Sequence, residues 1–345
     1  MLRMFKSVLR NKRGRKLPVT EPFRPSMSMR IDDLHEPNFP VDLVYTWVDG
    51  SDPEQIARVN EYLPEGQRVE VERFTSHDEL KYALRSAHMF VPWINHIYIV
   101  TNGQVPTWLA NHPKISIITH DAILDSKYLP TFNSHVIESA LHHIPGLSEH
   151  YVYLNDDVAF LRPMTRLDFF SSGGLSYGIV SSVPLPNGPI TPDQPISVAA
   201  QKNSARLIFE EWGVWLDRRF KHTFYPQRKS VALDNEKLFA DHFDKTRSNR
   251  FRTHDDIVVC TTLNGYSGYL TGRGLIRRNR THYIKIKDAD APKAFSRVLN
   301  EKNTKHVRES ICLNDTYAEN EDENYRENLY TFLEKYYPRP SPYEK

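Results

Sequence analysis

The chain has 345 residues, of which 26% are charged and 39% hydrophobic, and its formal net charge at pH 7 is +2. This composition is typical of a folded globular protein and argues against a disordered or membrane-embedded chain. The near-neutral charge also argues against nucleic acid as the main partner, because nucleic acid requires a basic face.

The first 40 residues are expected to form a basic segment followed by a linker. Seven basic residues lie between Arg3 and Lys16, with apolar residues among them and no acidic residue before Glu21. A short amphipathic helix of this kind would lie on an anionic inner leaflet, while a solvated tail is the alternative. Prolines from Pro18 to Pro40 indicate a linker.

The folded body begins with an apolar, β-rich run at residues 41–48. This run ends at residues 49–53 (Asp-Gly-Ser-Asp-Pro), whose composition is typical of a turn. Apolar residues at helical spacing then predict a helix from Leu80 to Val91, after a capping box formed by Ser76 and Glu79.

Strand and helix patterns alternate through the next part of the chain. We predict strands at residues 96–100, 114–119 and 151–154, and a helix at 134–143. This alternation predicts an α/β fold with a Rossmann-like, mostly parallel sheet flanked by helices.

The C-terminal portion is expected to be mainly helical. Residues 181–195 are rich in Pro and Gly and predict a long surface loop or lid, followed by helices at 198–220 and 230–244. Cys260 and Cys312 are the two cysteines, too few for a disulfide framework, so we expect free thiols in a reducing compartment.

Acidic residues follow two of the predicted strands. Asp49 and Asp52 follow the first strand, and Asp156 and Asp157 follow the strand at 151–154. Ligands of open α/β sheets bind beyond the carboxyl ends of the strands, where adjacent carboxylates suit Mg²⁺. Such an ion neutralises a transferring phosphoryl group. The alternative is that both groups are ordinary turn residues.

Basic residues in the second half provide candidates for acid–base chemistry and phosphate binding. His222 lies in a basic stretch and is suited to deprotonate a hydroxyl group. Arg247, Arg250 and Arg252 form a second cluster suited to phosphate, although exposed, solvated side chains would give the same pattern. No Gly-rich phosphate loop or GxSxG elbow is present. The residues alone therefore predict a metal-assisted α/β enzyme acting on a phosphorylated substrate.

Four stretches of the chain resemble the conserved regions of the Stealth family, in the family's order. They are residues 41–53, residues 78–158, residues 222–252 and residues 312–315. This family includes bacterial capsular polysaccharide phosphotransferases and the catalytic subunit of the animal lysosomal-enzyme N-acetylglucosamine-1-phosphotransferase. The chain lacks the long insertions of the animal enzymes, which favours a bacterial member.

The resemblance implies a glycosyltransferase-A-like catalytic domain over residues 41–316, between the basic segment and linker (1–40) and a C-terminal tail (317–345). It implies transfer of hexose-1-phosphate, with N-acetylhexosamine-1-phosphate expected, from a UDP-sugar to a glycan hydroxyl. A phosphodiester would form in a capsular or exopolysaccharide, UMP would leave, and Mg²⁺ or Mn²⁺ would assist.

Roles for individual residues also follow from the resemblance. The implied catalytic residues are His222 as base or proton shuttle, Arg252 as the clamp on the phosphate, Asp157 and Asp315. The implied metal ligands are Asp156, Asp157 and Asp315. The implied substrate-binding residues are Trp47, Asp49, Asp52, Arg85, Asn133, Asn155 and Arg228.

The expected partners are the UDP-sugar donor and a glycan acceptor, and no nucleic acid. Because such acceptors grow on lipid carriers, we expect a cytoplasmic enzyme, peripheral on the inner face of the plasma membrane. Two alternatives remain at this point: a metal-dependent glycosyltransferase that releases UDP, and a non-catalytic glycan-binding module of the same fold.

Overall fold

The computed structural model describes residues 37–63, 77–316 and 321–345. The basic segment 1–16 and Ser76 of the expected capping box therefore lie outside the described residues. Within the described part, no helix is long and apolar enough to cross a membrane.

The centre of the fold is a five-stranded sheet. Its strand order is β3 (Ile115–Thr119), β2 (Ile97–Thr101), β1 (Val41–Thr46), β4 (His150–Asn155) and β8 (Tyr225–Arg228). The first four strands are parallel, and β8 pairs antiparallel with β4. The predicted α/β fold with a mostly parallel sheet is thus confirmed. Strand β1 is central, which explains its mostly apolar sequence, in which Asp42 is the one charged residue.

Two smaller sheets extend this core, and the sequence did not predict them. One consists of β10 (Thr281–Lys285), β11 (Ser310–Asn314) and β5 (Val158–Phe160), and the other of β7 (Arg218–Phe220), β6 (Ser176–Pro184) and β9 (Gly274–Arg277). Strand β5 follows β4 after a two-residue turn, and β11 pairs antiparallel with it. This pairing places the end of β11 near the end of β4.

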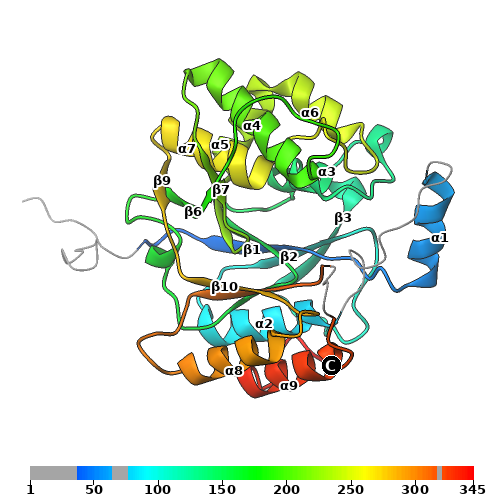
Figure 1. Cartoon of the computed structure of the whole chain (residues 1–345), viewed down its shortest axis with the longest axis vertical. Coiled ribbons are helices and arrows are strands. Elements are labelled where there is room, and N and C mark those ends of the chain that lie inside the picture. The colour runs from blue at the N-terminus through cyan, green and yellow to red at the C-terminus, as the bar shows by residue number, and fades with distance from the viewer. Residues whose placement is uncertain (1–36, 64–76, 317–320) are drawn as a thin grey trace, which may run out of the picture. The chain divides into compact units, whose positions relative to one another are not determined.

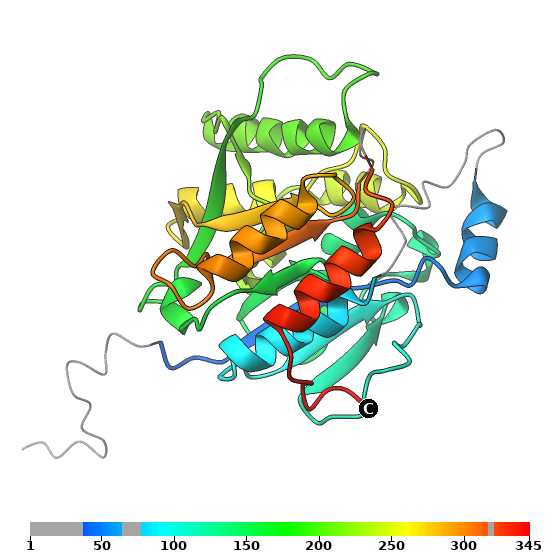
Figure 2. The same ribbon diagram turned by 60° about the horizontal axis from the view of Figure 1, so that its bottom comes forward.

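Helices cover both sides of the strands (Figure 1). On one side lie α2 (Glu79–Phe90), α8 (Ala291–Glu301) and α9 (Tyr325–Tyr336), and on the other α4 (Ile196–Trp212), α5 (Lys229–Leu238), α6 (Ala240–Arg247) and α7 (Asn264–Leu270). Helices α8 and α9 pack side by side (Figure 2). The remaining helices are α1 (Pro53–Tyr62) and the short α3 (Ser134–Glu138).

Three helices are shorter than their apolar patterns predict. Helix α4 ends before Gly213, whose φ of 68° is left-handed, so the predicted helix 198–220 is wrong in its last third. The predicted helix 230–244 is divided at Phe239 into α5 and α6. The predicted helix 134–143 is interrupted after α3, and a 3₁₀ turn follows at Leu141–His143.

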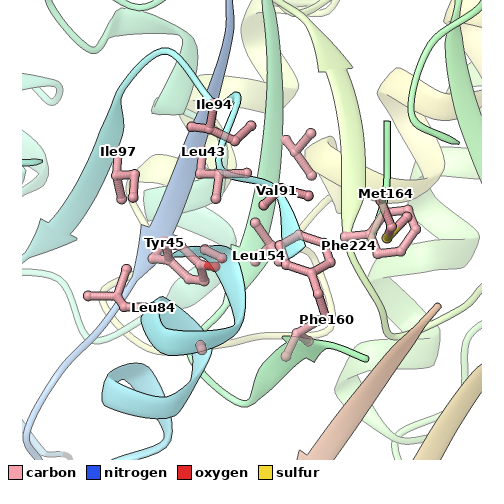
Figure 3. Packing of buried hydrophobic residues seen from close by; sticks show 14 of the residues in the cluster. Leu43, Tyr45, Leu84, Val91, Ile94, Ile97, Leu154, Phe160, Met164 and Phe224 are labelled. Carbon is pink, nitrogen blue, oxygen red and sulfur yellow. The ribbon is translucent and has the colours of Figure 1, made fainter. Parts of the chain in front are cut away.

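The largest hydrophobic cluster joins the central sheet to α2. Leu43 and Tyr45 of β1 face Leu84 of α2, and Phe160 and Phe224 extend the cluster toward the other strands (Figure 3). All five side chains are fully buried. Burying a side chain of this size stabilises the fold by about 1.5–3 kcal/mol, so this cluster holds β1 and α2 in place.

The segment expected as a C-terminal tail packs into the fold. Helix α9 buries Leu329, Phe332 and Leu333 against α8 and β11 in a second hydrophobic cluster. Near the chain end, Glu344 accepts hydrogen bonds from Arg85 Nε (2.9 Å) and Nη2 (2.8 Å), and both side chains are 6% exposed. The described part of this segment therefore belongs to the folded body.

We predict that Glu344→Gln lowers the free energy of unfolding by about 3 kcal/mol, because it removes the buried carboxylate that pairs with Arg85 and leaves only the exposed Glu334 as an ionic partner. Burial opposes ionisation of Glu344, but the hydrogen bonds from Arg85 and Ser341 outweigh it and lower the pKa of Glu344. The stabilisation is therefore present above the unfolded-state pKa of about 4.3 and is lost as the pH falls through the folded-state pKa.

Urea unfolding of the wild type and the variant between pH 7 and pH 3 measures this effect. The difference between the two proteins should shrink below about pH 4. Glu327→Gln, which changes an exposed acid on α9, is the matched control and should have no effect. An equally large effect in the control would contradict the assignment.

Candidate active site

A cavity of about 480 Å³ lies at the carboxyl ends of β1 and β4. Thr46 of β1 pairs in register with Asn155 of β4, so the residues that follow both strands meet at one edge of the sheet. Strand β2 lies on the other side of β1, which makes this edge the topological switch point where α/β proteins bind ligands. The end of β11 completes the cavity with residues 313–316.

Asp156 and Asp157 occupy the turn between β4 and β5. The Asp157 carbonyl accepts a hydrogen bond from Leu313 N (2.9 Å), and its Oδ2 accepts one from the Cys312 thiol (3.3 Å). Burial raises the pKa of Cys312 well above its ordinary value, so the thiol stays protonated and acts as a donor. Burial and the neighbouring Asp157 raise the pKa of Asp156 to about 7.

His222 faces these carboxylates from the segment between β7 and β8. Its Nε2 lies 3.3 Å from Asp157 Oδ1 and 3.1 Å from Asn155 Nδ2, so Nε2 donates to Asp157 when it is protonated and accepts from Asn155 when it is not. Burial disfavours the charged imidazole, but the carboxylates of Asp157 and Glu138 outweigh it and raise the pKa of His222. The Nε2 atom is therefore placed to take up and release a proton in the cavity.

Arg252 lines the same cavity and is held by α3. Its Nε donates to Ser134 Oγ (3.1 Å) at the first residue of that helix. The neighbouring Asn133 is fully buried and donates from Nδ2 to the carbonyl groups of Asn249 (3.1 Å) and Phe251 (3.2 Å). Asn133, predicted to bind substrate, therefore does not line the cavity and instead positions the segment that carries Arg252.

Asp315 also lines the cavity, but its charge is balanced by the chain itself. Its Oδ2 lies 2.9 Å from His77 Nε2, and its Oδ1 lies 2.7 Å from Lys287 Nζ. Burial opposes the ionised form, but these two hydrogen-bonded partners lower the pKa of Asp315 below its ordinary value. By contrast, no basic side chain among the described residues pairs with Asp156. Asp156 and Asp157 are thus better metal-ligand candidates than Asp315.

Two of the predicted substrate-binding arginines lie outside this cavity. Arg85 is bound by Glu344, and Arg228 Nε donates to Glu149 Oε1 (2.9 Å) beside the start of α5. Both guanidinium groups stabilise the surrounding fold. Trp47 does line the cavity, and Asn155 contacts His222 there. Asp49 and Asp52 line a second, adjoining cavity.

The sequence did not single out Glu79 and Glu138 as site residues, although both line the cavity. Burial, followed by repulsion from Asp156, raises the pKa of Glu79 well above its ordinary value. Burial likewise raises the pKa of Glu138. Glu79 had a local explanation in the expected capping box, and its Oε2 does accept a hydrogen bond from His77 N (2.6 Å). Because the capping box already accounted for Glu79, its position in the cavity was not expected from the sequence.

The donor atoms in this cavity fit a hard divalent cation. Carboxylates crowd around Asp156, and a cation would relieve their repulsion. Asn314 Oδ1 is buried and has no hydrogen-bond partner in the described part of the chain. Carboxylate and amide oxygens are the ligands that Mg²⁺ and Mn²⁺ prefer. The protonated Cys312, which donates to Asp157, is not a ligand of this kind.

Comparison with protein families matches most of the folded body. Four family models match: Stealth protein conserved region 1 at residues 39–67, region 2 at 73–177, region 3 at 221–269 and region 4 at 298–345. The chain belongs to the Stealth family. The regions occur in the order expected from the sequence, and each of them contributes residues to the cavity.

Several curated relatives are polysaccharide phosphotransferases. The chain is 39% identical to the exopolysaccharide phosphotransferases SCO6023 of Streptomyces coelicolor and CpsY of Mycobacterium tuberculosis, over 89% of its length. It is 36% identical to the capsular polysaccharide phosphotransferase LcbA of Neisseria meningitidis over 88% of its length. It spans 53% of SCO6023 and 58% of CpsY, about half of these relatives, and 85% of LcbA.

A solved structure of the galactosyltransferase LgtC in complex with donor and acceptor sugar analogues also aligns with the chain. The TM-score is 0.44 and the sequence identity 11%, over 87% of this chain and 96% of that one. No residue role follows from this alignment.

The raised pKa of Asp156 predicts that metal binding depends on pH near neutrality. Because a metal competes with the proton for the carboxylate, Mn²⁺ affinity should rise about tenfold between pH 6 and pH 8. Isothermal titration calorimetry with Mn²⁺ measures this change. Asp156→Asn should weaken binding and flatten the pH dependence, whereas wild-type affinity that does not change with pH would contradict the assignment.

Proposed function

We propose that this protein transfers hexose-1-phosphate from a UDP-sugar to a glycan hydroxyl and releases UMP. The donor expected from the family is a UDP-N-acetylhexosamine, and the product is a phosphodiester in a capsular or exopolysaccharide. The observation that carries the proposal is one cavity in which Asp156 and Asp157 face His222 and Arg252. The names of the curated relatives support the same class of reaction.

Each side chain has a role in this reaction. His222 Nε2 takes the proton of the acceptor hydroxyl while the hydroxyl oxygen attacks the sugar-bound phosphorus. The bond from this phosphorus to the bridging oxygen breaks, and UMP leaves with that oxygen. Arg252 binds the non-bridging oxygens of the transferring phosphate, and Asn155 and Asp157 hold the imidazole.

A divalent cation, Mg²⁺ or Mn²⁺, would be held by Asp156 and Asp157 and would neutralise charge on the diphosphate. The chain's own contribution is to place an acceptor, a base and a guanidinium around one phosphorus. Positioning and charge neutralisation supply most of the rate in phosphoryl transfer, so no covalent intermediate is required.

The subcellular location of the enzyme is part of the same proposal. A lipid-linked acceptor at the inner leaflet of the plasma membrane fits the basic residues between Arg3 and Lys16, which would hold a cytoplasmic enzyme at the membrane surface. The domain boundaries are also part of the proposal. The catalytic domain would begin at residue 41 and would include the packed C-terminal segment.

The released nucleotide tests the reaction class. We expect that incubation with UDP-hexoses, Mg²⁺ and short glycan acceptors yields UMP and a phosphodiester signal in phosphorus NMR. Release of UDP without a phosphodiester would instead identify a metal-dependent glycosyltransferase, since the attack would then occur at the sugar carbon. Glycan binding without any turnover would indicate a non-catalytic module.

His222→Ala should reduce transfer by about a hundredfold or more, because the base is lost, and should leave the circular dichroism spectrum unchanged. His306→Ala is the matched control, since His306 is exposed and does not line the cavity. It should retain normal turnover. Near-normal turnover in His222→Ala would remove this residue from the mechanism.

A further inference from the structure

A second cavity of about 920 Å³ adjoins the first, and Trp47 lines both. It is bounded by the β1–α1 turn, helix α1, the segment after β2, and α9. Its volume is in the range of cavities that hold organic ligands. None of the side chains with a role in the proposed reaction (Asn155, Asp156, Asp157, His222 and Arg252) lines this second cavity.

Aromatic side chains contribute to this second cavity from three separate elements. Trp47 follows β1, Trp108 follows β2, and Tyr330 lies on α9 and is 37% exposed. The faces of sugar rings carry C–H groups that pack on aromatic rings, and aromatic side chains next to polar groups are therefore suited to carbohydrate.

The polar groups of this cavity are held in place by one another. Gln104 Nε2 donates to Asp52 Oδ2 (2.7 Å), and Gln104 Oε1 accepts from Asp49 N (2.9 Å). Asn102 Nδ2 donates to Gln55 Oε1 (2.6 Å). Carboxylate and amide groups that are already held in position accept hydrogen bonds from sugar hydroxyls with little further loss of side-chain entropy.

The charge of this cavity disfavours an anionic ligand. Its described lining residues include four acids (Asp49, Asp52, Glu54 and Asp78) and one base, Arg58. The residues Asp49 and Asp52 have no basic partner in the described part of the chain. Asp78, although at the N-cap position of α2, makes no capping hydrogen bond with its side chain. A nucleotide diphosphate would be repelled here, whereas in the first cavity His222, Arg252 and the proposed cation would offset the charge of the acids.

We propose that this second cavity binds the acceptor glycan, and that it selects segments composed of uncharged sugars over acidic ones. This inference rests on the proposed function, because it assigns the acceptor side of that reaction. It also assigns Asp49 and Asp52, which the resemblance implied to bind substrate, to the acceptor. Because Trp47 lines both cavities, a glycan bound here presents its end to the phosphate near His222.

Glycan binding is measured by isothermal titration calorimetry without donor, using three tetrasaccharides: cellotetraose, its N-acetylglucosamine counterpart and tetragalacturonate. At least one of the two neutral probes should bind, and tetragalacturonate should bind more weakly than it. Trp108→Ala and the exposed Tyr330→Ala should each weaken neutral binding about tenfold. Tyr269→Ala removes an exposed aromatic side chain outside both cavities and should have no effect.

A variant that removes two charges but keeps the fold tests the electrostatic part of the proposal. Asp49→Asn with Asp52→Asn keeps the turn and the N-cap of α1, because asparagine caps helices as well as aspartate does. This double variant should improve tetragalacturonate binding relative to the neutral probe. An unchanged ratio, or failure of both neutral probes to bind, would overturn the proposal.

Donor use is measured separately as UMP release from the UDP-sugar in water, without acceptor. The Tyr330→Ala variant should leave the KM for the donor unchanged. If this variant raised the KM for the donor instead, the cavity would be part of the donor site and the inference would be wrong. If the wild type bound glycan but released no UMP when an acceptor was present, the reaction proposal would fail and the glycan site would stand.

Discussion

The parallel pairing of β1 with β4 is the constraint on which the site depends. Because Thr46 and Asn155 are in register, the residues that follow both strands leave the sheet at the same edge. The pairing of β5 with β11, together with the hydrogen bond from Leu313 N to the Asp157 carbonyl, then adds the fourth conserved region to that edge. Four distant parts of the chain thus meet around one cavity.

This convergence concentrates negative charge in a partly buried place. The raised pKa values of Glu79, Glu138 and Asp156 are the electrostatic cost of that arrangement. The hydrophobic cluster between β1 and α2 and the docked C-terminal helix hold the acids in place despite this cost. The same crowding would give the site its affinity for the proposed cation, so the electrostatic cost and the proposed function have one origin.

Charge also distinguishes the two cavities on either side of Trp47. On one side, His222 and Arg252 lie beside oxygen ligands, which suits a metal and a diphosphate together. On the other side, acids and amides lie beside aromatic rings, which suits uncharged sugar. In the proposed reaction, Trp47 would keep the donor and the acceptor apart until they react.

The sequence by itself determined the elements with strong local signals and the chemistry available to them. The apolar runs at β1, β2, β3 and β4, and the acids that follow β1 and β4, are read from neighbouring residues alone. Only the tertiary structure decided which polar and charged residues reach the cavity. Arg85, Asn133 and Arg228 bind partners that are distant in the chain, and Glu79 and Glu138 enter the site through helix placement. The physical reason is that the role of a polar or charged side chain depends on the partner it contacts, and long-range packing determines that partner.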